Sequence, residues 1–360
     1  MAKKRALVLG GGAPNFTLMS GALLALHHAK MEFDHIYMAG AGAVVGLVYM
    51  SPKQPLTPEQ ALLNTMNYGI SDLIYSMVPI NYKLFSKGGP SAAAFRDYWT
   101  NLPPIQAAMN QYGMNDSQKL ASDWLLFNGA MICPAEMNCF SKGMCAHMPF
   151  IDNVVDFDKL KNAKPEYYLN AYCIEDGECV EFKKPDLDVH HFRAAMSFPF
   201  IYPPYRIGTK HYYEGAAVDS LNLIDLMDEL DSKGHVDEVV VLDVMKPDLI
   251  HRPRNLWDAY AQSIIVPLVA NAEKELAMFL HWVDTGHVVK LPGKNVSPRM
   301  QALLANQHHP APPSLTAATL RFDDFIPAQH KPFMLDWSKS NLEILFDAGY
   351  RAGKHFVNIH

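Results

Sequence analysis

The hydrophobic pattern of the first fifty residues alternates between short apolar runs and longer mixed stretches. Residues 5–9 form an apolar run before a cluster of glycines, which is typical of a buried strand. A helix-length stretch follows to about residue 29, and a second apolar run at 35–39 precedes small and apolar residues at 42–50. A strand, a crossover helix and a second strand in this order predict parallel neighbours with a right-handed connection.

Strand patterns stop after this region and return near residue 167. From 57 to about 131 the pattern is helical, which predicts an inserted helical cover over the sheet. Further strands are predicted at 167–174, 179–182, 211–213, 238–244, 287–291 and 316–322. The run 238–244 is the richest in β-branched residues and is predicted to be a central, buried strand. A two-residue turn at Asp176 and Gly177 would place Cys173 opposite Val180.

Two long helices are predicted in the carboxyl-terminal half. Residues 259–283 are apolar but interrupted by Pro267 and by the charged residues 273–275, so the pattern predicts no membrane span. Ser338 is the predicted N-cap of an amphipathic final helix that ends near residue 356. Together these patterns predict an α/β protein with one domain, residues 1–360, that holds a mostly parallel central sheet and a cover insertion at about 57–150.

Composition and charge narrow the functional classes. Of the 360 residues, 49% are hydrophobic and 19% are charged, as in an ordinary globular protein. The net charge of −6 excludes the basic footprint of nucleic-acid binding, and without a polybasic patch we expect at most peripheral membrane contact. The apolar run after the basic first residues is too short for an export signal, so a cytoplasmic location is expected.

Cysteine and histidine spacing predicts neither disulfides nor a metal centre. The five cysteines are an odd number, which suits a reduced compartment, and none of them forms a CxxC pair. Histidines occur in pairs at 27–28, 190–191 and 308–309. The first pair lies on a predicted helix, where adjacent side chains point in different directions and chelate poorly. We expect no cofactor and no metal.

Three consecutive glycines, Gly10, Gly11 and Gly12, connect the first strand to the first helix. Such a loop directs backbone N–H groups outward beside a helix N-terminus, where they favour an anion. Both a dinucleotide phosphate loop and an oxyanion hole use this arrangement. The dinucleotide fingerprint requires a glycine where Asn15 stands and an acidic residue at the end of the second strand, whereas Asp34 precedes that strand. The oxyanion hole is therefore the favoured interpretation.

The second strand runs into a sharp turn and a helix of small residues, within 35–46. This is the pattern of a nucleophile elbow, which holds a serine exposed at the top of a parallel sheet. The apex of this turn, however, is Gly40, which stands between Ala39 and Ala41. The sequence thus predicts a hydrolase framework from which the reacting atom is missing.

Several segments, taken together, resemble the patatin-like phospholipases. The glycine loop, the elbow and the segment 193–223 occur in the order found in that family. The strongest similarity lies in residues 193–199 (RAAMSFP), in Pro203-Pro204 and in residues 211–216 (HYYEGA). Segments 149–160 and 335–349 are also similar to family segments. The resemblance implies a patatin-like three-layer fold with a mostly parallel central sheet.

The resemblance also implies roles for individual residues. Gly40 would stand at the nucleophile position, and Glu214 at the position of the aspartate that completes a Ser-Asp dyad in the family. The glycine loop would be the oxyanion hole. The implied substrate-binding residues are Gly10, Gly11, Gly12, Ala13 and Ala41.

Several departures from the family pattern occur together. Met38 and Gly40 replace the first glycine and the serine of G-x-S-x-G, Glu214 replaces the dyad aspartate, and Pro14 stands where the family usually has arginine or lysine. Loss of a triad serine costs on the order of a million-fold in rate. The extra methylene of Glu214 shifts its carboxylate by more than about 1 Å, which can cost about a hundredfold. Efficient serine-based hydrolysis is not expected.

The sequence therefore predicts a patatin-like lipid- or acyl-binding protein that has lost its serine nucleophile. Its expected partner is a lipid or fatty-acyl ligand, with a protein partner as a further expectation. The alternative is an acyl hydrolase or acyltransferase of altered chemistry in which Glu214 is the general base. An ordinary hydrolase would need another nucleophile, but Ser20 is interpreted as a helix-packing residue and Ser197 as a turn residue.

Overall fold

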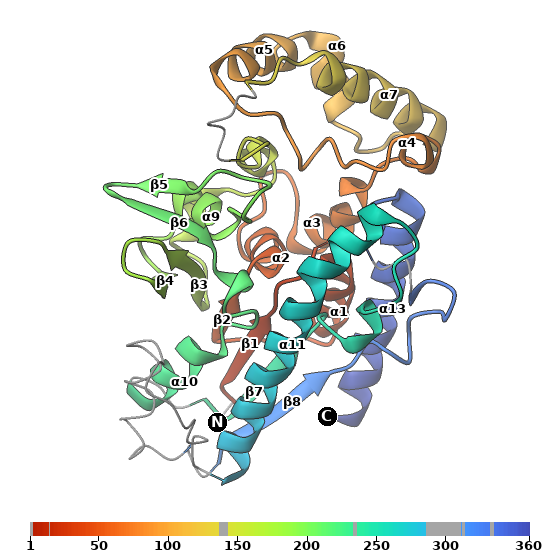
Figure 1. Ribbon diagram of the computed structural model, residues 1–360. Coiled ribbons are helices and arrows are strands. Elements are labelled where there is room, and N and C mark those ends of the chain that lie inside the picture. The colour runs from red at the N-terminus through yellow and green to blue at the C-terminus, as the bar shows by residue number, and fades with distance from the viewer. Residues whose placement is uncertain are drawn as a thin grey trace.

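The apolar runs of the sequence form the strands of a mixed central sheet in the computed structural model (Figure 1). The structure describes residues 3–13, 15–136, 143–232, 236–285, 311, 314–331 and 335–360. The strand order is β5-β6-β3-β2-β1-β7-β8, and β4 also pairs with β3. The bounds are β1 Arg5–Leu9, β2 His35–Met38, β3 Glu166–Cys173, β4 Glu178–Lys183, β5 Tyr205–Ile207, β6 Lys210–Glu214, β7 Glu238–Leu242 and β8 Thr316–Leu320.

Five neighbouring strands, β3, β2, β1, β7 and β8, run parallel, whereas β4 and β6 each pair antiparallel with β3, and β5 pairs antiparallel with β6. The sheet is therefore mostly parallel, as the fold class predicted from the sequence requires. All five residues of β7 are buried, and β7 lies between β1 and β8. Buried parallel strands read as continuous apolar runs rather than alternating ones, which is why the sequence identified them.

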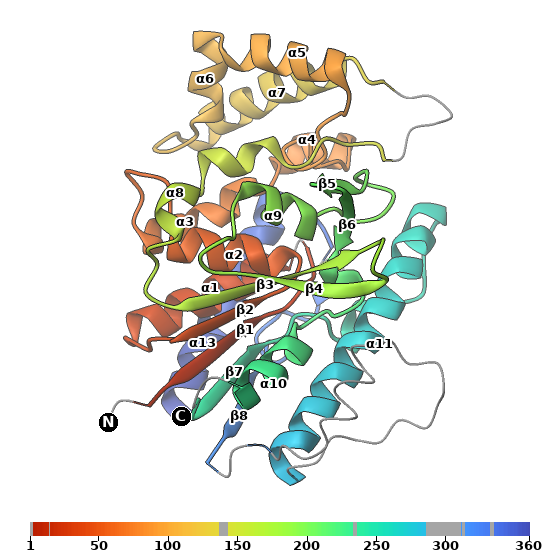
Figure 2. The same ribbon diagram turned by 90° about the vertical axis from the view of Figure 1, so that its left-hand side faces the viewer.

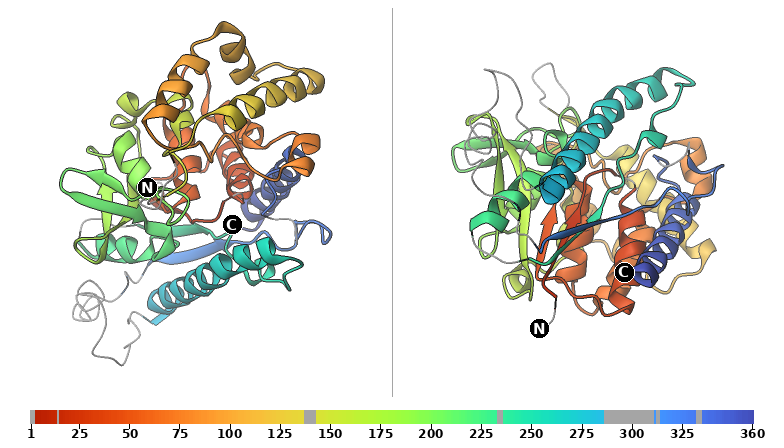
Figure 3. Two further views of the ribbon diagram at one scale, coloured as in Figure 1. Left: turned by 45° about the horizontal axis from the view of Figure 1, so that its top comes forward. Right: turned by 90° about the horizontal axis from the view of Figure 1, so that it is seen from below.

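Helices cover both faces of the sheet. Their bounds are α1 Phe16–His28, α2 Ala41–Met50, α3 Pro58–Asn64, α4 Asp72–Met77, α5 Pro90–Thr100, α6 Pro103–Met109, α7 Asp116–Ile132, α8 Phe157–Leu160, α9 Val189–Ala195, α10 Leu223–Ser232, α11 Leu256–Thr285 and α13 Lys339–Ile359. Helices α1, α2 and α13 lie on one face, and α10 and α11 on the other (Figure 2). The view from below shows the sheet between α11 and the α1–α13 pair (Figure 3).

The closest helix pair is α1 with α13, which lie side by side. Their backbones approach so closely that a Cβ atom at Gly21 would overlap the Phe346 carbonyl, and one at Gly349 would overlap the Leu18 carbonyl. The apolar stripe of α13 buries Leu342 against this contact. Helix α1, near the start of the chain, and helix α13, at its end, thus pack together on one face of the sheet.

Helices α4 to α7 lie beyond the end of the sheet at which β1 and β2 finish (Figure 1). Capping boxes begin α3, through Thr57 and Gln60, and α7, through Asn115 and Gln118. In these boxes each side chain satisfies a free backbone N–H at the start of the helix. We propose that 57–150 is an insertion into a single domain of residues 1–360.

The structure differs from two local predictions, the register of the β3–β4 hairpin and the side-chain cap at Ser338. The hairpin register predicted from the sequence is wrong, because Cys173 pairs with Glu178 and Cys179 with Tyr172. The reason is that Ile174 donates its N–H to His211 on β6, which lengthens the loop beyond two residues. The predicted N-cap of α13 is in place at Ser338, but its side chain accepts no capping hydrogen bond.

The short strand β5 was not predicted, and the predicted strand at 287–291 lies outside the described residues. Helix α11 contains Pro267, as expected. Among the described helices, none combines the length and the hydropathy that crossing a bilayer would require.

Candidate functional site

The glycine loop and the elbow lie at the carboxyl ends of two adjacent parallel strands. Leu9, the last residue of β1, is in register with Met38, the last residue of β2. The Ala39 N–H donates to the Leu9 carbonyl over 3.0 Å, which ties the two turns together. Open α/β sheets build their ligand sites at this end of the strands. The expectation that both loops share one end of the sheet is confirmed.

The elbow backbone has a conformation that glycine adopts without strain and other residues do not. Gly40 has φ 45° and ψ −125°, a combination that side chains beyond glycine rarely adopt. A Cβ atom at Gly42 would overlap the Leu9 carbonyl, so α2 packs directly against the end of β1. These two glycines explain how a strand can turn sharply into a helix here.

Glu214 lies directly beside the apex of the elbow. It is the last residue of β6, opposite Ala171 of β3, and its N–H donates to the Ser197 carbonyl over 3.1 Å. A Cβ atom built on Gly40 would come into forbidden contact with the Glu214 Oε1 atom. In this conformation the carboxyl group occupies the position of an elbow side chain, so a side chain at residue 40 would require Glu214 to shift. The structure thus brings together Gly40 and Glu214, which the sequence paired only through a resemblance.

Glu214 is a partly exposed residue, and desolvation of its carboxyl group raises its pKa to about 8. Burial raises the pKa of Tyr202, with smaller contributions from Cys145 and Glu214. Burial raises the pKa of the Cys145 thiol to about 11. At neutral pH Glu214 is consequently a neutral carboxylic acid among neutral neighbours.

Ala216 joins the elbow to the glycine loop. Its Cβ atom lies 2.9 Å from the Cβ position of Gly40 and 2.8 Å from that of Gly11. The preceding Gly215 packs so tightly against Asn170 that a side chain would not fit. The Glu-Gly-Ala sequence thus places its acid at the apex and its alanine between the two loops.

Backbone donors around the site are only partly used. The Gly10 N–H donates to the Leu242 carbonyl over 3.4 Å, and the Gly11 N–H donates to the Ser220 carbonyl over 2.9 Å. Within the part of the chain that the structure describes, no acceptor faces the N–H groups of Gly12, Ala13 or Ala41. The bonds of Gly10 and Gly11 hold the loop in place. Pro14 lies outside the described residues.

A residue that the sequence did not single out fixes the loop behind the site. Glu275 of α11 accepts hydrogen bonds from the Ser220 and Leu221 N–H groups, each over 3.0 Å. Burial, followed by the neighbouring Asp219, raises its pKa well above the usual range. Its position three residues after Ala272, on the buried face of α11, was the available signal.

Met245 covers the glycine loop from the end of β7. Its sulfur lies 2.6 Å from the Cβ position of Gly12, which also has a positive φ of 121°. The buried Asp243 carboxylate accepts from the Met245 N–H over 2.9 Å and pairs with Lys246 Nζ over 2.6 Å. This arrangement fixes the loop that follows β7 against Gly12.

The two serines considered as substitute nucleophiles are bound to backbone. Ser20 Oγ donates to the Phe16 carbonyl over 3.2 Å, and Ser197 Oγ donates to the Arg193 carbonyl over 2.7 Å. Both residues are fully buried. Serine side chains commonly donate such a hydrogen bond to the backbone carbonyl four residues earlier.

Within the described residues, no three His, Cys, Asp or Glu side chains gather in a way that could hold a metal ion. His190 Nδ1 lies 2.7 Å from the Tyr205 hydroxyl, and His191 Nδ1 lies 2.8 Å from the Asp188 carboxylate. The pair 308–309 and Cys139 lie outside the described residues. Cys133, Cys145, Cys173 and Cys179 are free thiols.

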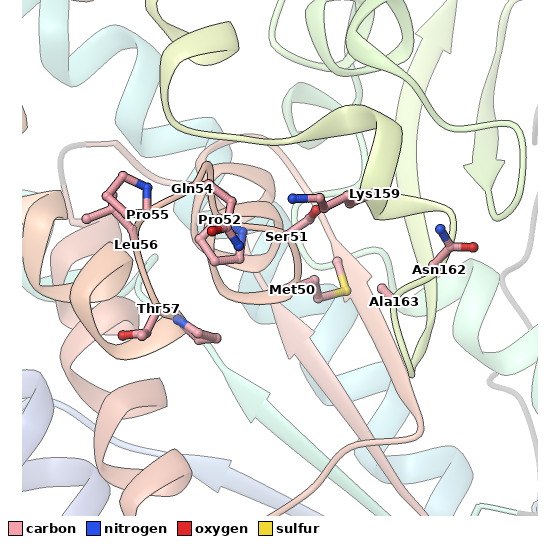
Figure 4. Close-up of a pocket in the computed structure, with 11 residues that line it drawn as sticks. Met50, Ser51, Pro52, Gln54, Pro55, Leu56, Thr57, Lys159, Asn162 and Ala163 are labelled. Carbon is pink, nitrogen blue, oxygen red and sulfur yellow. The ribbon is translucent and has the colours of Figure 1, made fainter.

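The two described pockets lie away from the elbow. The larger, of about 690 Å³, is at the other end of α2, where Met50 and Ser51 face Lys159 and Asn162 (Figure 4). Because α2 has ten residues, this pocket is about 15 Å from Gly40. The smaller, of about 330 Å³, is lined by the stacked rings of Tyr37 and Tyr168 near the starts of β2 and β3.

The sequence matches one family of known proteins. A family model described as patatin-like phospholipase matches residues 7–227. No curated protein sequence shows significant similarity to the chain. VipD from Legionella pneumophila is similar in structure over 99% of this chain and 67% of its own, with 12% identity and a TM-score of 0.37.

The heterodimeric ExoU-SpcU complex from the type III secretion system of Pseudomonas aeruginosa is also similar in structure. The match covers 85% of this chain and 57% of that chain, with 14% identity and a TM-score of 0.25. The chain thus spans about two thirds of VipD and little more than half of the chain in this complex.

Proposed function

The chain belongs to the patatin-like phospholipase family, and we propose that it is a lipid- or acyl-binding member that has lost the serine nucleophile. In this proposal Gly40 stands at the nucleophile position, and serine-based hydrolysis of lipid acyl esters is weak or absent. The glycine loop and the start of α2 bind the polar end of an acyl group. A protein partner remains a further prediction.

The observation that carries the proposal is the contact between the Gly40 Cβ position and Glu214 Oε1. A dyad acid must leave room for the nucleophile that it serves. Here the longer acid occupies that room, so the absence of serine and the presence of glutamate are parts of one arrangement. The elbow turn itself has φ and ψ angles at Gly40 that would strain a residue with a side chain.

The binding part of the proposal rests on the remaining donors. The N–H groups of Gly12 and Ala41 lie on the two turns that Ala216 holds together. Backbone N–H groups at the start of a helix favour negative charge or a polarised carbonyl oxygen. An acyl head group is the ligand that such a framework suits.

A photoreactive fatty acid with a diazirine near its carboxyl end tests the proposal. We expect cross-links in peptides that contain residues 10–13, 38–44 or 212–218. Cross-links confined to the pocket at 50–58 and 159–163 would contradict it, and Asn162→Trp, which fills that pocket, is the matched control. A fluorophosphonate probe should leave the protein unlabelled, because no activated serine stands at the elbow. Stoichiometric labelling of any serine would overturn the loss of the nucleophile.

A second candidate function is an acyl hydrolase or acyltransferase in which Glu214 acts as general base. It is favoured by the pKa of about 8, because a general base works best when its pKa lies near the operating pH. Glu214→Gln separates the two functions. It should abolish any turnover by this route, whereas a binding protein shows no turnover to lose.

A further inference from the structure

We infer that the outward face of helix α7 docks on the surface of a zwitterionic lipid bilayer. This α7 face belongs to the helices that lie beyond the end of the sheet, so the inference does not rest on the function proposed for the elbow. The large exposed side chains that form the face are Trp124, Leu125, Met131 and Ile132. The sequence predicts at most peripheral membrane contact, and the α7 face gives that contact a location.

The α7 face is apolar where a helix at a protein surface is normally polar. Its large side chains recur after seven or eight positions, about two turns, so they lie on one stripe of the helix. Ala121 and Asn128, which are also exposed and uncharged, lie on the same stripe. The buried positions of α7 instead include Ser122 and Asp123 beside Phe127. The helix therefore directs its apolar stripe outward and its polar side chains inward.

Packing fixes α7 in this orientation. The buried Asp123 carboxylate accepts hydrogen bonds from the Ser71 N–H over 3.0 Å and from the Tyr82 hydroxyl over 2.7 Å. On the same side of the helix, Gly129 packs so closely on the Trp99 ring that a Cβ atom would overlap it. Rotation of α7 would strip the carboxylate of its partners, which is costly in the interior. The outward position of the apolar stripe is thus built into the fold.

The charge of this region suits a bilayer without net charge. Residues 124–135 include no charged side chain, and neither do residues 98–115, from which Tyr98 and Tyr112 are exposed. The charges at the two ends of α7 are paired, because Asp116 lies 3.4 Å from Lys339 Nζ and Lys87 Nζ donates to carbonyls in the last turn. Tryptophan and tyrosine are the side chains that gather at membrane–water interfaces. A neutral face of this composition matches zwitterionic lipid.

The area of the face favours a bilayer over a protein partner. Helix α7 has 17 residues, so the face is about 25 Å long and about 10 Å wide, roughly 250 Å². A stable protein interface buries about 800 Å² on each partner, and a second copy of the chain would need a surface of that size. Binding to a bilayer requires no matching shape and grows with the apolar area that is buried.

The position of α7 also suits a bilayer. Helices α5, α6 and α7 form the layer farthest from the sheet, beyond the carboxyl ends of β1 and β2 (Figures 1 and 2). A bilayer that lies against this layer contacts the end of the molecule that carries the elbow. The sheet and its covering helices need not open for this contact.

The experiment measures partition coefficients on phosphatidylcholine vesicles by sedimentation. We expect Ile132→Gln to lower the coefficient about fivefold, and Trp124→Gln with Ile132→Gln to lower it about twentyfold or more, because apolar area leaves the bilayer. Ile359→Gln is the matched control: Ile132 is 64% exposed and ends α7, whereas Ile359 is 63% exposed and ends α13, away from α7. The control should bind like the natural chain.

Salt separates this contact from an electrostatic one. Because the face is neutral, the coefficient of the natural chain should be the same at about 0.1 M and about 0.5 M sodium chloride. Binding that needs phosphatidylserine and is lost at high salt would place the contact on a charged surface and overturn the inference.

Three further outcomes would also contradict it. The natural chain may bind no vesicles, or Ile359→Gln may lose as much binding as Ile132→Gln. In the third, the chain dimerises without lipid in sedimentation velocity and Ile132→Gln makes it monomeric, so that the face serves a second copy. Thermal unfolding of each variant should match the natural chain, since the replaced side chains are exposed.

Discussion

At the scale of single residues, Gly40 and Glu214 must be understood together. The elbow turn keeps φ 45° at its apex, which costs a non-glycine residue about 1–3 kcal/mol. A serine at this position would carry this strain, and only a reacting hydroxyl gives a functional reason for it. In the proposed loss of the nucleophile, glycine relieves this strain, and the space at the apex accepts the longer side chain of Glu214.

Restoring the nucleophile should therefore require two changes. We expect Gly40→Ser with Glu214→Asp to hydrolyse p-nitrophenyl butyrate about tenfold or more above the natural chain, because the Gly12 and Ala41 donors remain. Gly40→Ser alone should give less, because its Cβ atom meets Glu214 Oε1. Gly40→Ala with Glu214→Asp carries the same strain without a hydroxyl and is the control. A folded double variant with no rate above this control would show that the donors do not form a working oxyanion hole.

Met38 is better left unchanged in this experiment. Although it replaces a family glycine, its side chain is fully buried, and its sulfur packs against the position of a Cβ on Gly46 of α2. We expect Met38→Gly to lower the free energy of unfolding by about 2–5 kcal/mol, as large-to-small core changes do. Urea denaturation measures this. A loss below about 1 kcal/mol would show that Met38 packs loosely and that a glycine could be restored there.

At the scale of whole elements, glycines set how closely helices pack. Gly21→Ala should destabilise the protein by several kcal/mol, because the new Cβ would overlap the Phe346 carbonyl and force α1 and α13 apart. Gly88→Ala is the matched control, since its nearest atom would lie at an ordinary 3.5 Å. Thermal unfolding of both variants checks this. Equal melting temperatures would mean that the α1–α13 contact is not essential.

Much of the element pattern could be predicted from the sequence, for identifiable reasons. The parallel strands and the elbow were found because buried parallel strands are continuous apolar runs, as β7 shows. The register of the β3–β4 hairpin was missed, because Ile174 bonds to β6, a contact that no local pattern reveals. Glu275 was missed for the same kind of reason: its partners, Ser220 and Leu221, lie more than fifty residues away.

At the scale of the whole molecule, the site gathers buried acids on one end of the sheet. Glu214, Glu275 and Asp243 come from β6, α11 and the end of β7, and burial raises the pKa of each. Since the three acids come from different elements, no single helix or strand accounts for their gathering at this end of the sheet. Acids that are costly to ionise at the carboxyl ends of the strands are consistent with a site for a ligand rather than with a purely structural core.

These raised pKa values make the stability of the protein depend on pH in a defined direction. Between the unfolded pKa of Glu214, near 4.5, and its folded value of about 8, the folded state keeps a proton that the unfolded state releases. The free energy of unfolding therefore falls as pH rises through this window, by at most about 1.4 kcal/mol per pH unit from one group, and levels off above it. Carboxylates with lowered pKa values, such as Glu238 beside Arg5, act only at more acidic pH.

Urea denaturation at pH 5, 7 and 9 measures this slope. Because Glu214→Gln cannot ionise, we expect it to be less stable than or equal to the natural chain at pH 5 and to gain on it steadily toward pH 9. Glu273→Gln, at an exposed position of α11, is the matched control and should follow the natural chain at every pH. A constant difference between Glu214→Gln and the natural chain would mean that Glu214 already ionises near its ordinary pKa. The carboxyl group at the elbow would then be an anion at neutral pH, and it would repel the head group that the site is proposed to bind.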